Sequence, residues 1–431
     1  MMRTLRYIPQ WLRSGRNRSG YGTGTTADGN FRPRSEAGQS LPAALITLAV
    51  ASLLLTPFLT FVSSRSLGTG VAQETFNDLY TADAGLEYGI WRLLNVPSFR
   101  IQADLNAGTA QNLAFPGSLN GISPNISITA LPIGSWYIRQ SAPANIQNGG
   151  SLAYAGGDRI YVLKGNSKTF GYYSISGDQW FSLANIPSKV KQGGSLVYGG
   201  GNFLYALCGN KSKEFWRYNI STNSWSSRKD TPDKVDNGGS LVYDGNNYLY
   251  AFRGKQKDFW RYNISSNSWS SRKDAPDKTQ VGADLVYDGG NNIYAFRGNS
   301  TEFWRYSISG DSWSSLQNTP AKVSGGGSLA YYGGDYIYAL RGNSTDFWRY
   351  SVTMDSWTAL TPTFAKVGLG ADMIFTHSEG GFTPQGNSTA FWEFEVTPPR
   401  YDISVQAGSV SIDTRYEIDG STRTILFWDI E

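Results

Sequence analysis

The chain has 431 residues, a formal net charge of +4, 14% aromatic residues, one histidine and one cysteine. A single cysteine excludes a disulfide within the chain, and so few His and Cys residues exclude the zinc and copper sites that need several such ligands. The net charge is too small to demand nucleic-acid binding, and no motif indicates a cofactor.

The N-terminal region predicts a membrane segment. Residues 1–38 are a basic leader with seven Arg, and residues 41–62 are an uncharged apolar run long enough to cross a bilayer as a helix. The positive-inside rule then puts the N-terminus in the cytoplasm and the chain after this single span outside the cell. A secretory signal peptide is the competing interpretation, but the apolar run is too long and no Ala-x-Ala site follows it.

The helix is expected to continue past the apolar run to about Asn95. Apolar side chains recur at helical spacing through this stretch, at Phe76, Leu79, Leu86, Ile90 and Leu93. At ~1.5 Å per residue, the roughly 57 residues from Gln39 would form a rod of about 85 Å.

A basic leader, then Gly38, then an uninterrupted apolar helix resembles a type IV prepilin, in which a dedicated peptidase cuts after the glycine. The resemblance implies that the mature chain begins at Gln39 and that its partners are a prepilin peptidase and other pilin-like subunits. Residues 80–87 also resemble minor pilins of the PilX kind. Major pilins carry Glu where this chain has Ala43, which favours a minor subunit; a plain membrane anchor with a polar neck is the alternative.

Six copies of a unit of about 44 residues fill the middle of the chain. Each unit reads as four alternating strands separated by turn residues, which predicts a propeller of six four-stranded sheets. Every unit is marked by a Phe, at Phe170, Phe215, Phe259, Phe303, Phe347 and Phe391, and by a Trp, at Trp136, Trp180, Trp225, Trp269, Trp313 and Trp357. Because the Trp series starts and ends before the Phe series, the strand around Trp136 is predicted to complete the last sheet and close the ring.

The order of hydrophobic strand, Gly-containing turn, aromatic strand with a Tyr and then Trp resembles the kelch repeat over residues 133–399. Kelch units usually carry two glycines after the second strand. Here the first glycine is replaced, as in Arg253-Gly254 and Arg297-Gly298. The resemblance therefore implies a fold, and no function is carried over from a particular kelch family.

Short alternating runs flank the repeats. Strands before and after an insert indicate one interrupted sheet, and a long helix packed on such a sheet is the form of a pilin. The predicted fold class is mainly β: a six-bladed kelch-like propeller inserted into a pilin-like α+β domain with a long N-terminal transmembrane helix. The predicted parts are the leader (1–38), the pilin-like helix and first strand (39–132), the propeller (133–399) and the C-terminal strands that complete the pilin-like sheet (400–431).

Two sets of charged residues repeat with the unit. One lysine occupies each of five loops between units, at Lys189, Lys234, Lys278, Lys322 and Lys366. A basic ring of this kind suits an acidic polymer, whereas solvated loop lysines are the plainer interpretation. Arg253, Arg297 and Arg341 are each followed five residues later by an acid, which predicts a cross-turn ion pair in each of those units.

We predict that the protein is not an enzyme. A Ser-His-Asp triad needs a histidine, and His377 stands in no local signature of one. The predicted function is adhesion or recognition of an acidic surface polysaccharide or a protein by a propeller displayed on the cell surface, within a minor pilus or pseudopilus component. The alternatives are a surface glycan-active enzyme and a membrane-anchored structural propeller without a ligand.

Overall fold

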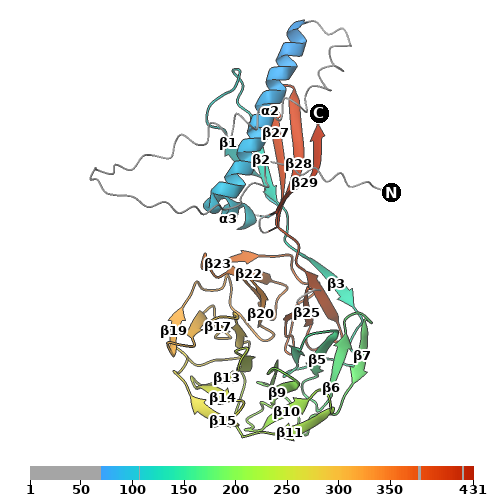
Figure 1. Ribbon diagram of the computed structural model, residues 1–431, viewed down its shortest axis with the longest axis vertical. Helices are drawn as coiled ribbons and strands as arrows, with labels where there is room; N and C mark the ends of the chain where they lie inside the picture. Colours follow the sequence, from blue (N-terminus) through green and yellow to red (C-terminus); the bar gives the residue numbers. More distant parts are fainter. Residues whose placement is uncertain (1–68, 106, 377–379, 420–421) are drawn as a thin grey trace, which may run out of the picture. The chain divides into compact units, whose positions relative to one another are not determined.

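The computed structural model describes residues 69–105, 107–376, 380–419 and 422–431. The leader 1–38, the predicted cleavage site at Gly38 and Gln39, and the apolar run 41–62 lie outside these residues. Within the described chain, no helix has the length and apolarity that crossing a membrane requires. The described residues are mainly β, with two helices, six four-stranded sheets and one five-stranded sheet (Figure 1).

Helix α2 (Thr69–Asn95) ends at the residue that the apolar spacing predicted. Pro97 begins the next helix, α3 (Pro97–Leu105), because proline lacks an N–H group and is tolerated only in the first turn. The apolar stripe of α2 is buried at Leu79, Leu86 and Leu93.

The five-stranded sheet is built from both sides of the repeats. Its strands, all antiparallel, lie in the order β1 (Gln111–Ala114), β2 (Asn125–Ala130), β27 (Arg400–Ala407), β28 (Val410–Asp419) and β29 (Thr422–Ile430). Strand β2 pairs with β27 over its whole length, from Asn125 opposite Gln406 to Ala130 opposite Tyr401. The interrupted sheet that the flanking strands predicted is therefore present.

Helix α2 packs closely on this sheet. A Cβ atom at Gly85 would lie 2.7 Å from Val405 Cγ1, so only glycine allows this approach. Nearby, the buried carboxylate of Asp78 accepts hydrogen bonds from the backbone N–H and the hydroxyl of Ser409, both at 2.8 Å. These bonds tie the helix to the turn between β27 and β28.

The repeats form six sheets, each with its strands in chain order. Sheet one has β4 (Ser151–Tyr154), β5 (Arg159–Leu163), β6 (Phe170–Ser174) and β7 (Gln179–Ser182); sheet two has β8 (Ser195–Tyr198), β9 (Phe203–Leu207), β10 (Phe215–Asn219) and β11 (Ser224–Ser227); sheet three has β12 (Gly239–Tyr243), β13 (Tyr248–Arg253), β14 (Phe259–Asn263) and β15 (Ser268–Ser271). Sheet four has β16 (Asp284–Tyr287), β17 (Asn292–Phe296), β18 (Phe303–Ser307) and β19 (Ser312–Ser315); sheet five has β20 (Ser328–Gly333), β21 (Tyr336–Leu340), β22 (Phe347–Ser351) and β23 (Ser356–Ala359). Sheet six has β24 (Ile374–Thr376), β25 (Gly380–Pro384), β26 (Phe391–Glu395) and, from the start of the repeats, β3 (Ser135–Arg139).

The six sheets close into a propeller-like ring (Figure 1). Their first strands contact one another in cyclic order, from β4 through β8, β12, β16, β20 and β24 back to β4. Strand β3 pairs with β26, from Ser135 opposite Glu395 to Arg139 opposite Phe391. The strand around Trp136 thus completes the last sheet, as the phase of the two marker series predicted.

The Phe and Trp markers recur because they join neighbouring sheets. The marker Phe of each sheet meets the marker Trp of the next sheet, with ring centroids 4.9–5.0 Å apart in all six cases. Each Trp Nε1 also donates a hydrogen bond of 2.8–2.9 Å to a backbone carbonyl of the preceding sheet or the loop that follows it. At the closing point, Trp136 packs on Phe347 and Phe391 packs on Trp180.

A second repeated position forms hydrogen bonds between neighbouring sheets near the axis of the ring. A serine or an aspartate stands within two residues of the start of each first strand: Ser151, Ser195, Ser240, Asp284, Ser328 and Asp372. In five of the six junctions, the side-chain oxygen of this residue accepts a hydrogen bond of 2.7–3.1 Å from a backbone N–H group of the next sheet. The donor is the residue that follows the serine or aspartate of that next sheet, as when Leu196 donates to Ser151. These bonds satisfy backbone groups that face the axis.

Candidate functional site

The propeller-like ring has two chemically different rims. One rim carries the loops between the second and third strands of each sheet and the loops that join one sheet to the next, and we call it the basic rim. The other carries the loops between first and second and between third and fourth strands, and we call it the acidic rim. The chain enters at β3 and leaves at β26 through the acidic rim, because these two strands replace a third-to-fourth-strand hairpin.

All lysines of the chain lie on the basic rim. The five predicted binding residues are exposed and occupy equivalent inter-sheet loops: Lys189, Lys234, Lys278, Lys322 and Lys366. The other nine belong to the same two classes of loop: Lys164, Lys168, Lys191, Lys211, Lys213, Lys229, Lys255, Lys257 and Lys273. None of the five predicted lysines makes a side-chain ion pair within the described part of the chain. Their charges therefore face solvent.

The acidic rim has the opposite composition. Those of its loops that the structure describes contain no Lys or Arg, and seven of their residues are aspartates: Asp158, Asp178, Asp244, Asp288, Asp311, Asp335 and Asp355. These carboxylates hold turns together; Asp244 Oδ1, for example, accepts the backbone N–H groups of Asn246 at 2.9 Å and Tyr248 at 3.0 Å. The repeat thus gives the ring one positive and one negative rim.

The predicted cross-turn ion pairs are present. Arg253 meets Asp258 at 3.0 Å, Arg297 meets Glu302 at 2.5 Å and Arg341 meets Asp346 at 2.6 Å. Each of these arginines also donates from Nε to the backbone carbonyl of a predicted lysine, at 3.1–3.4 Å: Lys234, Lys278 and Lys322. The arginines therefore position the lysine loops, and their own charges are already paired.

The structure adds partners that the spacing did not predict. Arg253 also contacts Asp233 at 2.6 Å, and Arg297 contacts Asp277 at 2.5 Å. The equivalent position for Arg341 is Ala321, so that arginine has one carboxylate instead of two.

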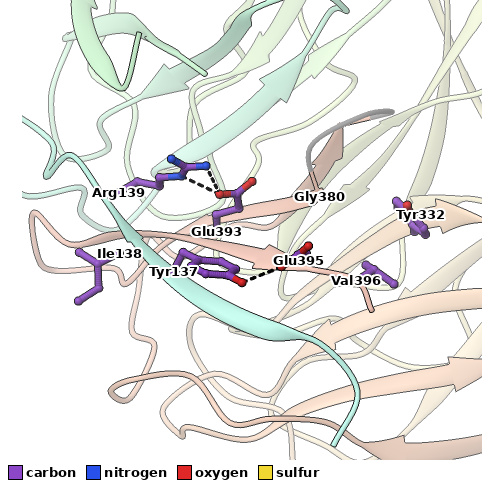
Figure 2. Close-up of a pocket in the computed structure, with 8 residues that line it drawn as sticks. All are labelled: Tyr137, Ile138, Arg139, Tyr332, Gly380, Glu393, Glu395 and Val396. Carbon is purple, nitrogen blue, oxygen red and sulfur yellow. Dashed lines mark hydrogen bonds and ion pairs between the residues drawn. The ribbon is translucent and has the colours of Figure 1, made fainter. Parts of the chain in front are cut away.

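A pocket of about 540 Å³ opens at the acidic rim of sheet six. Figure 2 shows Arg139 of β3 reaching Glu393 of β26, and Tyr137 reaching Glu395. Arg139 Nε donates to Glu393 Oε2 at 2.6 Å, and the Tyr137 hydroxyl donates to Glu395 Oε2 at 2.7 Å. The described residues that line the pocket are Tyr137, Ile138, Arg139, Tyr332, Gly380, Glu393, Glu395 and Val396.

This pocket lies where sheet six departs from the repeat. In three other sheets the second strand begins with an aromatic residue, and an arginine of the third strand stacks on its ring. The guanidinium carbon lies 4.0–4.3 Å from the ring centroid in these pairs: Arg217 on Phe203, Arg261 on Tyr248 and Arg349 on Tyr336. Sheet six has Gly380 at the aromatic position and Glu393 at the arginine position. The missing ring leaves the space, and the carboxylate takes its cation from the fourth strand instead.

Sequence reasoning did not identify this pocket. Aligning the six repeat units with one another would have indicated it. Glu393 stands where four units carry Arg, and Gly380 stands where three units carry an aromatic residue.

Catalysis by the described residues would depend on metal-binding or nucleophilic groups. They hold no group of three or more His, Cys, Asp or Glu side chains arranged for a metal ion. Cys208 is buried, and burial raises the pKa of its thiol to about 12, so it is no nucleophile at neutral pH. His377, around which a triad would have to form, lies outside the described residues.

No family model matches the sequence, and no curated protein matches it. Among solved structures, one described as the structure of YjhT aligns with 62% of this chain and 98% of its own, at 14% identity and a TM-score of 0.47. Another, a structural genomics protein of unknown function from Bacteroides thetaiotaomicron VPI-5482, aligns with 67% of this chain and 87% of its own, at 11% identity and a TM-score of 0.50. At such low identity the second likeness concerns the fold alone.

Proposed function

We propose that the protein is a membrane-inserted, pilin-like surface protein that displays a kelch-like six-bladed propeller for adhesion or recognition. In this proposal the basic rim contacts an acidic polymer outside the cell. The observation that carries it is the segregation of charge: all lysines lie on one rim, and seven aspartates with no Lys or Arg occupy the described loops of the other. Clustered charge of one sign attracts a polymer of the opposite sign.

The path of the chain also supports the basic rim as the contact surface. Residues 131–134 and 396–399 connect the five-stranded sheet to the ring, and both connections meet the ring at its acidic rim. The basic rim is therefore free of chain connections to the rest of the protein. The pilin-like part of the proposal is supported by a helix packed on an antiparallel sheet and by the leader that resembles a prepilin.

The test is binding of the full chain to alginate, an acidic polysaccharide. Replacing Lys234, Lys278 and Lys322 together by Ser should weaken binding at least about tenfold and flatten its dependence on salt, because screened charges supply the attraction. The melting temperature should stay unchanged, since exposed lysines contribute little to stability. Replacing the same three residues by Arg is the matched control, and it should retain binding because it keeps the charge.

Equal binding by the Ser and Arg variants would move the ligand site away from the basic rim. Hydrolysis of a glycan by the purified protein, lost on substitution of one carboxylate, would favour the glycan-active enzyme instead. An unprocessed leader, found by N-terminal sequencing in cells with an active prepilin peptidase, would leave a plain membrane anchor.

A further inference from the structure

The pocket of sheet six is a specialised feature of one copy in an otherwise regular ring. Departures from a repeat that cost packing without helping the fold are expected at functional positions. Here two substitutions coincide, since Gly380 removes a ring and Glu393 replaces an arginine that other sheets stack on that ring. Together they turn a filled position into a pocket of about 540 Å³, a size typical of sites for small ligands.

The backbone keeps the pocket open. Gly380 has φ +119°, and a Cβ atom there would lie 2.4 Å from the carbonyl oxygen of Phe394. A side chain at this position would strain the strand, so the space is fixed by the conformation of β25.

The walls combine aromatic surface with an excess of negative charge. Tyr137 and Tyr332 each expose 46% of their surface, on opposite sides of the pocket in Figure 2. Arg139 is engaged by Glu393, which is 5% exposed. Among the described lining residues, this leaves the exposed carboxylate of Glu395 without a cationic partner, and its one side-chain contact is with the Tyr137 hydroxyl.

The hydrogen bond to Glu395 raises the pKa of Tyr137, so the phenol remains a neutral donor and does not add a negative charge. In three other sheets the same place in the repeat holds an arginine guanidinium over an aromatic ring. The face of a tyrosine attracts a cation in the same way.

We infer that the sheet-six pocket binds a cationic nitrogen group, held between the Tyr137 and Tyr332 rings and ion-paired with Glu395. The occupant we infer is a lysine side chain of a partner protein, because three other sheets fill the same place with a cationic protein side chain. An anionic ligand is disfavoured because Glu395 and the aspartates of the acidic rim repel it. The site lies on the rim opposite the lysines, so it is independent of the proposed polymer binding.

The test uses the full chain and two small probes, N-acetyl-lysine amide and glucosamine, with binding measured by calorimetry or by NMR of the probe. Each charged probe is paired with a neutral analogue, N-acetyl-norleucine amide and N-acetylglucosamine. The lysine probe should bind at least about fivefold more tightly than its neutral analogue. The Glu395→Gln variant should lose that preference while keeping the wild-type melting temperature, because it preserves the shape of the pocket. Tyr332→Ala should weaken binding of the lysine probe by removing one wall.

Glu74→Gln, which removes an exposed carboxylate in α2, is the control and should bind like the wild type. Tighter binding of the lysine probe than of glucosamine supports a protein partner, whereas tighter binding of glucosamine would overturn the inferred occupant and assign the pocket to an amino sugar. Equal affinity for the lysine probe and its neutral analogue, no binding of the lysine probe, or an unchanged preference in Glu395→Gln would also overturn the inference.

Discussion

Two buried aspartates at the axis of the ring, Asp284 and Asp372, lie close enough to influence each other's protonation. The Ser328 hydroxyl lies 3.1 Å from Asp284 Oδ2 and 3.1 Å from Asp372 Oδ1. One hydroxyl has a single proton to donate, so Ser328 can donate to only one of these two oxygens at a time, although each carboxylate also accepts from another serine and from a backbone N–H group. The second carboxylate is best accommodated in its protonated form, because the axis is buried and no cation is among the groups that act on either one.

The pKa values of the two aspartates are shifted in the direction that this geometry predicts. Burial and the neighbouring Asp372 raise the pKa of Asp284 to about 7, and burial raises the pKa of Asp372 as well. The unfolded chain releases the Asp284 proton near the ordinary pKa of 3.8, whereas the folded chain keeps it to about 7. Between these values the folded state binds more protons, so stability falls as the pH rises through this window and levels off above it.

Asp284→Asn should remove much of that pH dependence, because the amide is neutral at every pH. We expect the melting temperature of the wild type to fall between pH 4.5 and pH 7.5 and that of the variant to fall less, as measured by calorimetry. One extra bound proton corresponds to about 1.4 kcal/mol of stability per pH unit. Asp274→Asn, at an exposed loop position, is the control and should keep the wild-type slope. An unchanged slope in Asp284→Asn would show that Asp284 does not carry the proton that makes stability depend on pH.

At the level of elements, the helix and the five-stranded sheet depend on small residues at their contact. Gly85 brings α2 against Val405 of β27 and Pro124, with a Cβ position 2.7–2.9 Å from both. Gly89, one turn later, faces Ile126, Ile128 and Ile403 at 3.4–3.5 Å and leaves more room. The two glycines make the same face of the helix a flat surface for the sheet.

Gly85→Val should destabilise this contact by about 1–3 kcal/mol, the usual cost of overpacking a close interface. Glu74→Val places the same β-branched residue at an exposed position of α2 and controls for helix propensity. Proteolysis of α2 in the full chain, followed over time, should be faster in Gly85→Val than in the control. Equal rates would mean that the helix does not rest on β27 at this point.

At the level of the whole molecule, closure of the ring rests on a strand that comes from the start of the repeats. Trp136 in β3 is 7% exposed and donates from Nε1 to the carbonyl of Thr361 at 2.9 Å. Trp357 holds the equivalent place in sheet five, where it is 6% exposed and donates to the carbonyl of Gln317 at 2.9 Å. The closing sheet is thus as fully packed as a sheet made from consecutive strands.

Trp136→Ala and Trp357→Ala should therefore destabilise the protein by similar amounts, roughly 3–5 kcal/mol each, as expected for a buried tryptophan. Denaturant melts of the two full-length variants make the comparison, with Trp357→Ala as the internal reference. If Trp136→Ala melted like the wild type while Trp357→Ala did not, the strand around Trp136 would not belong to sheet six.

Much of the fold was predictable because its signals are local and repeated. The Phe and Trp markers fixed the number of sheets, and their difference in phase identified Trp136 as part of the last one. The pairs of Arg253, Arg297 and Arg341 with acids five residues later were also predictable, since the two members of each pair flank one short loop.

The sequence by itself determined the repeat, its closure and the lysines of one rim, because each depends on residue type at a fixed spacing within the unit. Only the tertiary structure decided which side chains from different copies meet. The axial contact of Asp284, Ser328 and Asp372 joins sheets four, five and six, and Asp233 reaches Arg253 from a separate loop. The pocket likewise needs Arg139 and Glu393, which are 254 residues apart in the chain. Side chains so far apart in sequence become neighbours only when the ring closes.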